Sequence, residues 1–148
     1  MTGAPTAIGL DFVLDELFDL TLYQGLERSA RGDLRAILSE LIPVETRHLQ
    51  FWKSFFKIET AELDWPRRLK LLLLLAFCRC AGPVAVHMTL EAIEIYGIRK
   101  YLSVWERYRH TELGEAVRGI LSDEFGHEDE IVSRARARRI DPERVRSV

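Results

Sequence analysis

The chain of 148 residues has little of what marks several protein classes. It contains two cysteines, Cys78 and Cys80, whose side chains would point about 200° apart on a helix, so they cannot form a disulfide with each other. This composition excludes a disulfide framework and a four-cysteine zinc site. The longest uninterrupted apolar run, 71–78, is far shorter than the roughly 20 residues that a membrane-spanning helix needs.

The chain also has a small net charge and no recognisable secretory signal in its first ten residues. The 21 basic and 23 acidic side chains leave a net charge of −2, so no global charge attracts the chain to nucleic acid or to an anionic membrane. Residues 1–10 lack the basic and apolar regions of a secretory signal, and we expect a cytoplasmic location. With 47% hydrophobic residues, the chain can bury one core, which predicts a single domain over 1–148.

Helices dominate the expected secondary structure. Asn-Gly and Asp-Gly turns are absent, and apolar residues recur at intervals of three and four rather than two. Asp11, Asp64 and Thr111 are expected to cap the first, third and last helices. The expected helices are 11–30, 33–58, 64–80, 83–109 and 111–139. Four long helices, with a short helix in the long connection between the second and third, predict an all-α four-helix bundle with one crossover.

Polar residues interrupt the apolar stripes at matching depth. Glu45 and His48 interrupt the stripe of helix 33–58, and Glu124 and His127 interrupt that of helix 111–139. The stripe residues around them are Leu34, Leu38, Leu41, Trp52 and Phe55 in the former and Leu113, Val117, Ile120 and Ile131 in the latter. Helix 11–30 adds Glu16, and helix 83–109 adds Val84, His87, Glu91, Glu94 and Tyr101 on one face.

Buried carboxylates need compensating cations, because each uncompensated charge would cost several kcal/mol. A Glu-x-x-His pair from each of two helices and one Glu from each of two others form the ligand set of di-iron and di-manganese bundles. One such pair is weak evidence; two of them on the core stripes are stronger. The sequence therefore predicts metal ligands at Glu16, Glu45, His48, Glu91, Glu124 and His127. The alternative is a satisfied polar network in a metal-free bundle.

At these residues the chain resembles the ferritin-like superfamily, and rubrerythrin in particular, over nearly its whole length. Glu16 followed by Tyr23 is similar to that family's first-helix ligand and its hydrogen-bonding tyrosine, and Tyr101 would be the symmetry mate. Glu91-Ala-Ile-Glu94 resembles paired third-helix glutamates, which implies that Glu94 is an extra ligand or a neighbour of the ligands. Both tyrosines have an alternative as plain core aromatics. His87 is either a neighbour of the site or a satisfied core histidine.

A closer resemblance lies in Arg79-Cys-Ala-Gly82-Pro83 and in the arginine-rich segment 138–148. These are similar to the ferritin-like domain that precedes the membrane domain in vacuolar-iron-transporter-like proteins, also called membrane-bound ferritins or erythrin fusions. The resemblance implies that 140–148 links to an absent membrane domain and that a membrane iron transporter is the fused or separate partner. Alternatively, the arginines only oppose the dipole of the last helix.

Two features depart from the rubrerythrin pattern. Pro43 stands two residues before Glu45, where it removes a hydrogen bond to Ser39 and is expected to kink the helix. The chain also has no Cys-x-x-Cys pair for a rubredoxin-like iron site, so electrons must come from elsewhere or from the metal itself.

The expected function is iron binding at two adjacent iron ions, with manganese as the other metal that suits the ligands. In the resembling families two Fe(II) ions react with dioxygen or peroxide, which implies ferroxidase-like chemistry for iron detoxification or for delivery to a membrane iron or manganese transporter. Other interpretations are a metal-dependent sensor or oligomerisation module, and a di-iron peroxidase or oxygenase. The apolar segment 69–77 further predicts a homodimer.

Overall fold

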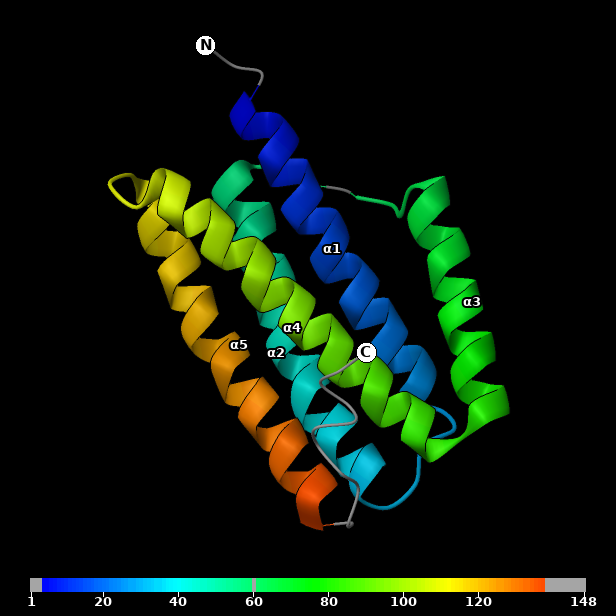
Figure 1. Ribbon diagram of the computed structural model, residues 1–148. Helices are drawn as coiled ribbons and strands as arrows, with labels where there is room; N and C mark the ends of the chain where they lie inside the picture. Colours follow the sequence, from blue (N-terminus) through cyan, green and yellow to red (C-terminus); the bar gives the residue numbers. More distant parts are fainter. Residues whose placement is uncertain (1–3, 60, 138–148) are drawn as a thin grey trace. The chain divides into compact units, whose positions relative to one another are not determined.

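The computed structural model describes the backbone of residues 4–59 and 61–137, and the side chains of residues 7–59, 61–122, 124 and 125. This part of the chain is all-α, as predicted, and has no strand (Figure 1). Its helices are α1 (Ala4–Glu27), α2 (Asp33–Phe56), α3 (Trp65–Ala81), α4 (Pro83–Tyr108) and α5 (Glu112–Ala137). Within the same residues, no helix is both long and apolar enough to span a membrane.

The helices fall into two compact units, divided between Gly82 and Pro83. In the first unit α1 and α2 form an antiparallel hairpin, and α3 packs against α1. The second unit is the antiparallel hairpin of α4 and α5. A single domain over 1–148 stays a prediction, and the proposed linker 140–148 lies outside the described residues.

Two of the three predicted helix caps are confirmed. Asp64 caps α3, since its side chain accepts a 3.0 Å hydrogen bond from the Arg67 backbone N–H. Thr111 caps α5, since its hydroxyl accepts a 3.3 Å hydrogen bond from the Gly114 backbone N–H. The predicted cap at Asp11 is wrong, because α1 begins at Ala4 and carries Asp11 inside the helix.

The core of the first unit lies along the facing stripes of α1 and α2. Its fully buried side chains, each at 0% exposure, are Phe12, Val13, Leu22, Tyr23, Ile37, Leu38 and Trp52. The predicted α2 stripe ends one turn early, because Phe55 is 36% exposed and its ring stands nearly perpendicular to that of Trp52, at 85°. In the second unit, Val84 is 52% exposed at the start of α4, so the prediction that it faces the core is also wrong.

Pro43 does not interrupt α2, which is helical from Asp33 to Phe56. Nearby side chains use the carbonyl groups around it: the Thr46 hydroxyl donates to Ile42 O at 2.7 Å, and Arg47 donates to Pro43 O at 3.3 Å. A hydroxyl bound to the carbonyl four residues earlier tends to bend a helix slightly. The helix therefore continues through the proline into the segment that carries Glu45 and His48.

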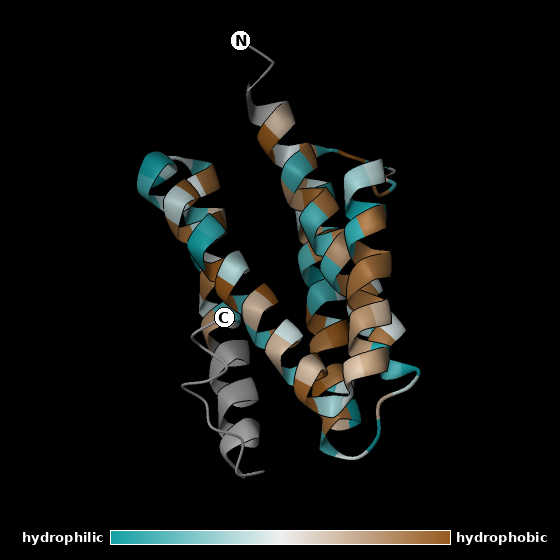
Figure 2. Ribbon diagram, turned by 45° about the vertical axis from the view of Figure 1, so that its right-hand side comes forward, coloured by the Kyte–Doolittle hydropathy of each residue, from teal (hydrophilic) through white to brown (hydrophobic). Residues whose placement is uncertain are grey.

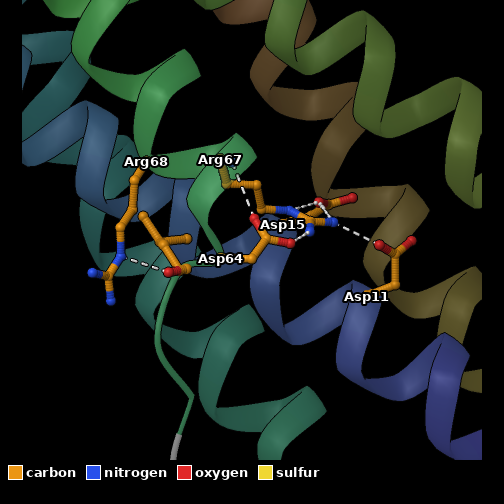
Figure 3. Close-up of polar contacts among 6 residues, drawn as sticks. Asp11, Asp15, Asp64, Arg67 and Arg68 are labelled. Carbon is orange, nitrogen blue, oxygen red and sulfur yellow. Dashed lines mark hydrogen bonds and ion pairs between the residues drawn. The ribbon is translucent and has the colours of Figure 1, made fainter.

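Helix α3 is held on α1 at both ends. At its start Arg67 forms ion pairs with Asp11, Asp15 and Asp64, at 2.6, 2.7 and 2.6 Å (Figure 3). In the second half of α3, the Leu75 side chain packs against Gly25 of α1. A Cβ added at Gly25 would be only 2.8 Å from Leu75 Cδ2. Because Asp11 and Asp15 precede Gly25 in α1, α3 runs parallel to α1.

Candidate metal centre

Two helices of the first unit bring three buried polar side chains together. Glu16 comes from α1, and Glu45 and His48 come from α2. Their exposed fractions are 3%, 2% and 2%, although glutamate and histidine usually lie at surfaces. Each helix also buries an apolar side chain one turn earlier, Phe12 before Glu16 and Leu41 before Glu45. The polar residues therefore share the stripe that forms the hairpin core, as the sequence predicted.

The turn between α1 and α2 sets these residues at the same height. Glu16 lies about three turns before the end of α1, and Glu45 lies about three turns after the start of α2. Between the helices, Gly32 adopts a φ of 58°, a conformation that glycine allows at little cost. The short turn thus brings the two glutamates opposite each other across the hairpin.

The distances between the three side chains fit a shared cation better than direct hydrogen bonds. His48 Nδ1 is 3.8 Å from Glu16 Oε2 and 3.7 Å from Glu45 Oε2. One ligand atom from each residue lies within 4.8 Å of the other two. Nitrogen–oxygen hydrogen bonds are shorter, at about 2.7–3.2 Å. Ligands that each bind one ion at about 2.0–2.2 Å stand roughly 3–4 Å apart. The Glu16–Glu45–His48 cluster therefore has the donors and the spacing of a metal site.

The second unit contains its own group of buried carboxylates. Glu91 and Glu94 on α4 are 1% and 2% exposed, and Glu124 on α5 is 5% exposed. A carboxylate oxygen of Glu94 lies within 4.8 Å of one from Glu124. Carboxylates this close repel each other unless a proton or a cation lies between them. The hairpin of α4 and α5 thus presents an acidic pair suited to bind a cation.

Gly97 makes room for Glu124 on the neighbouring helix. A Cβ built at position 97 would lie 3.6 Å from Glu124 Oε2, so the carboxylate packs directly against the α4 backbone. Our sequence analysis did not single out this glycine. The sequence did contain an indication of its role. A glycine inside a helix lowers stability by about 0.5–1 kcal/mol relative to alanine, so a glycine one turn after Glu94 suggests that another group packs closely there.

The remaining predicted site residues have mixed outcomes. His87, Tyr23 and Tyr101 are buried, at 1%, 0% and 4% exposure. Among the described side chains, the potential metal clusters include neither His87 nor Glu91. The role of the tyrosines as hydrogen-bond donors to the site stays a prediction. His127 lies on α5, but its side chain is outside the described residues, as is the side chain of Ile131.

Buried Thr89 also escaped the sequence analysis. It lies on α4 between His87 and Glu91 and is 6% exposed. A threonine at a helical position carries no sequence signal that separates a core position from a surface one, so only the structure locates it.

Comparisons with known proteins provide no relative: no family model matches the chain, and no similar curated protein or solved structure was found. The resemblance to ferritin-like proteins therefore stays a prediction based on the residues themselves. What the structure adds is a helical chain with a buried carboxylate–histidine cluster that could hold a metal ion.

Proposed function

We propose that the chain binds iron and oxidises Fe(II) with dioxygen or peroxide, in the manner of a ferritin-like protein. The observation that carries this proposal is the Glu16–Glu45–His48 cluster, in which two carboxylates and an imidazole are all at most 3% exposed. Burial of such groups is costly without a cation among them. A metal ion held by all three would offset that cost.

The donor set favours iron or manganese. Carboxylate oxygens with a few imidazole nitrogens suit Fe(II) and Mn(II), whereas structural zinc sites usually contain thiolates. Neither cysteine belongs to the cluster: Cys78 and Cys80 are free thiols on α3. We favour iron, with manganese as the metal that competes with it.

The full site would need ligands from both hairpins. We propose a four-helix bundle in which α3 is the crossover and in which Glu45 and Glu124 each bridge two ions. Glu16 and His48 would complete one side; Glu91, Glu94 and His127 would complete the other. This arrangement is the one known for bundles that hold two metals with glutamates and Glu-x-x-His pairs.

Iron would be the substrate as well as the ion that the glutamates and histidines bind. Each of two Fe(II) ions gives up one electron, and one molecule of dioxygen or peroxide accepts the two electrons. The protein's part is to hold charge and exclude water. Carboxylates balance the additional positive charge of Fe(III), and buried Leu41 and Trp52 lie one turn before Glu45 and one turn after His48 on the same helix. His48 must be neutral to ligate, because a metal ion binds only an imidazole nitrogen that carries no proton.

The experiment that tests the proposal is anaerobic titration with Fe(II), followed by exposure to oxygen. Iron per chain is counted, and the near-ultraviolet absorbance that accompanies Fe(III) formation is followed. The matched variants are Glu45→Gln, which removes a buried carboxylate, and Glu40→Gln, which removes an exposed one from the same helix. We expect two irons per chain in the wild type and in Glu40→Gln, and loss of both in Glu45→Gln.

Three results would count against parts of this proposal. Equal iron binding by Glu45→Gln and Glu40→Gln would refute the cluster as the metal site. Two tightly bound irons in a Glu124→Ala variant would refute the bridging role of Glu124. Tight binding without oxidation would refute the ferroxidase activity and would favour a metal-dependent sensor instead.

A further inference from the structure

Helix α3 carries an apolar stripe on the side that faces away from α1. Its side chains are large and exposed, and they recur mostly at intervals of three and four residues. Figure 2 shows the hydrophobic residues of α3 in brown along its ribbon. Their exposed fractions are 72% for Trp65, 41% for Leu69, 65% for Leu72, 63% for Leu73 and 51% for Phe77. Exposed apolar patches of this kind mark interaction surfaces. We call these five residues the α3 stripe.

The α3 stripe is distinct from the face by which α3 packs on its own unit. Leu75 contacts the Gly25 position of α1, and Cys78 is 3% exposed. Arg67 fixes the start of the helix on α1 through Asp11 and Asp15. These contacts place α3 on α1 and leave the stripe exposed on the opposite side of the helix.

Opposite charges flank the two ends of the α3 stripe. At the start of α3 lie the exposed carboxylates of Asp11, Asp64 and Glu62, at 54%, 41% and 86% side-chain exposure. With Asp15 these four carboxylates outnumber the three basic residues in the same part of the helix, Arg67, Arg68 and Lys70.

At the other end, α3 carries Arg79, and the loop that follows α1 carries Arg28 and Arg31, all exposed. These three arginines outnumber the two acidic residues that border the loop, Glu27 and Asp33. Because α3 runs parallel to α1, that loop lies beside the last turns of α3 (Figure 1). The flanks are therefore acidic at one end and basic at the other.

We propose that the α3 stripe is the interface with a second copy of this chain, related by a twofold axis that makes the two α3 helices antiparallel. In that arrangement each acidic end meets the basic end of the partner. A parallel pairing would bring like charges together at both ends. The polarity of the flanks thus selects the antiparallel arrangement.

The size of the stripe suits a dimer. With roughly 150–250 Å² for each of the two aromatic side chains and about 150 Å² for each leucine, the five exposed fractions leave about 500 Å² of apolar surface per chain. Two copies would bury about 1,000 Å² of it. Interfaces are roughly 60% non-polar, which gives a total near 1,600 Å², the usual size of a specific interface. An anionic membrane suits the stripe less well, because the carboxylates at its acidic end would be repelled.

The first test measures the mass of the metal-free chain in solution by light scattering. We expect twice the 17.1 kDa of one chain. Leu72→Lys places a charge in the stripe of both copies and should weaken the dimer by at least about 100-fold. The matched control is Tyr96→Lys on α4, where the side chain is 57% exposed outside the stripe, and it should leave the dimer intact. Leu75→Lys would not serve, because Leu75 packs against α1.

A cysteine experiment tests the antiparallel arrangement and does not depend on how Leu72→Lys folds. If the axis passes near Leu73, two copies of position 73 are adjacent, whereas two copies of Cys80 are about 20 Å apart, given a rise of 1.5 Å per residue. Disulfides need Cα atoms within about 7 Å. Mild oxidation should therefore cross-link a Leu73→Cys, Cys80→Ser variant into a dimer, and it should leave the wild type uncross-linked.

Several results would overturn the proposal. A wild-type monomer at high concentration, a Leu72→Lys variant that folds and stays dimeric, or cross-linking through Cys80 but not position 73 would each do so. A monomer that co-sediments with vesicles of anionic lipid would assign the stripe to a membrane instead. Because the test uses metal-free protein, and because the α3 stripe contains none of the proposed metal ligands, its outcome is independent of iron binding.

Discussion

We expect Arg67, a partly exposed residue at the start of α3, to contribute strongly to the stability of the fold. Its guanidinium contacts Asp11, Asp15 and Asp64 at 2.6–2.8 Å, and its side chain is 21% exposed. Burial by itself lowers the pKa of Arg67, but the hydrogen bond and charge of Asp15, with the hydrogen bonds of Asp11 and Asp64, raise that pKa above its ordinary value. The network stabilises the charged guanidinium and holds α3 on α1.

The expected loss follows from the exposure of each partner. A hydrogen bond to a charged group contributes about 1.5–3 kcal/mol when buried. Asp15 is 22% exposed and should be near the lower end of this range; Asp11 and Asp64, at 54% and 41%, should add less than about 1 kcal/mol each. Arg67→Met should therefore lower the free energy of unfolding by about 2–3 kcal/mol.

The assay is urea unfolding followed by circular dichroism, with Arg68→Met as the matched control. Arg68 is 58% exposed and pairs with Glu62, which is 86% exposed, so its removal should cost less than about 0.5 kcal/mol. Because its pKa is raised above an ordinary value that is already high, Arg67 stays charged at neutral and mildly alkaline pH, and the loss should not change between about pH 6 and pH 9. Equal losses in the two variants would refute the reasoning.

Three further predictions concern single residues. Gly119→Ala should stabilise α5 by about 0.5–1 kcal/mol, because nothing lies within 4 Å of a Cβ at position 119. Gly114→Ala should destabilise α5, because the added Cβ would meet the Tyr108 carbonyl. Thermal unfolding of the two variants tests both expectations. Cys80 should react quickly with a thiol reagent and buried Cys78 only on unfolding, and equal rates would contradict the placement of α3. Pro43→Ala restores a donor for the Ser39 carbonyl and should raise the melting temperature of the metal-free chain; an unchanged or lower value would show that the proline has no net cost.

Periodic patterns made the helices predictable, since apolar spacing reports directly on which face of a helix is buried. The helix starts were less certain, as Asp11 shows. An aspartate before an apolar residue resembles an N-cap, but Asp11 instead binds Arg67 from within α1. Pro5 in the first turn of α1 was the better signal, because proline is favoured there.

The candidate site was predictable to the extent that its residues lie on helical stripes. The spacing of Glu45 and His48 places both on the core face, and the equal distances from the turn place Glu16 opposite them. In contrast, Arg67 bonds with residues 52 and 56 positions away, and no local pattern reports such contacts. The packing of Glu124 on Gly97 likewise depends on how two helices approach each other.

The Gly97 position has a consequence for how the acidic group of the second unit could be altered. The 3.6 Å between a Cβ at that position and Glu124 Oε2 is an ordinary van der Waals contact, so alanine would fit while any larger side chain would push the carboxylate aside. A substitution larger than alanine at position 97 would reorient Glu124 while leaving every glutamate in the sequence. The size of the side chain at position 97 therefore determines the direction in which the Glu124 carboxylate points, without changing the carboxylate itself.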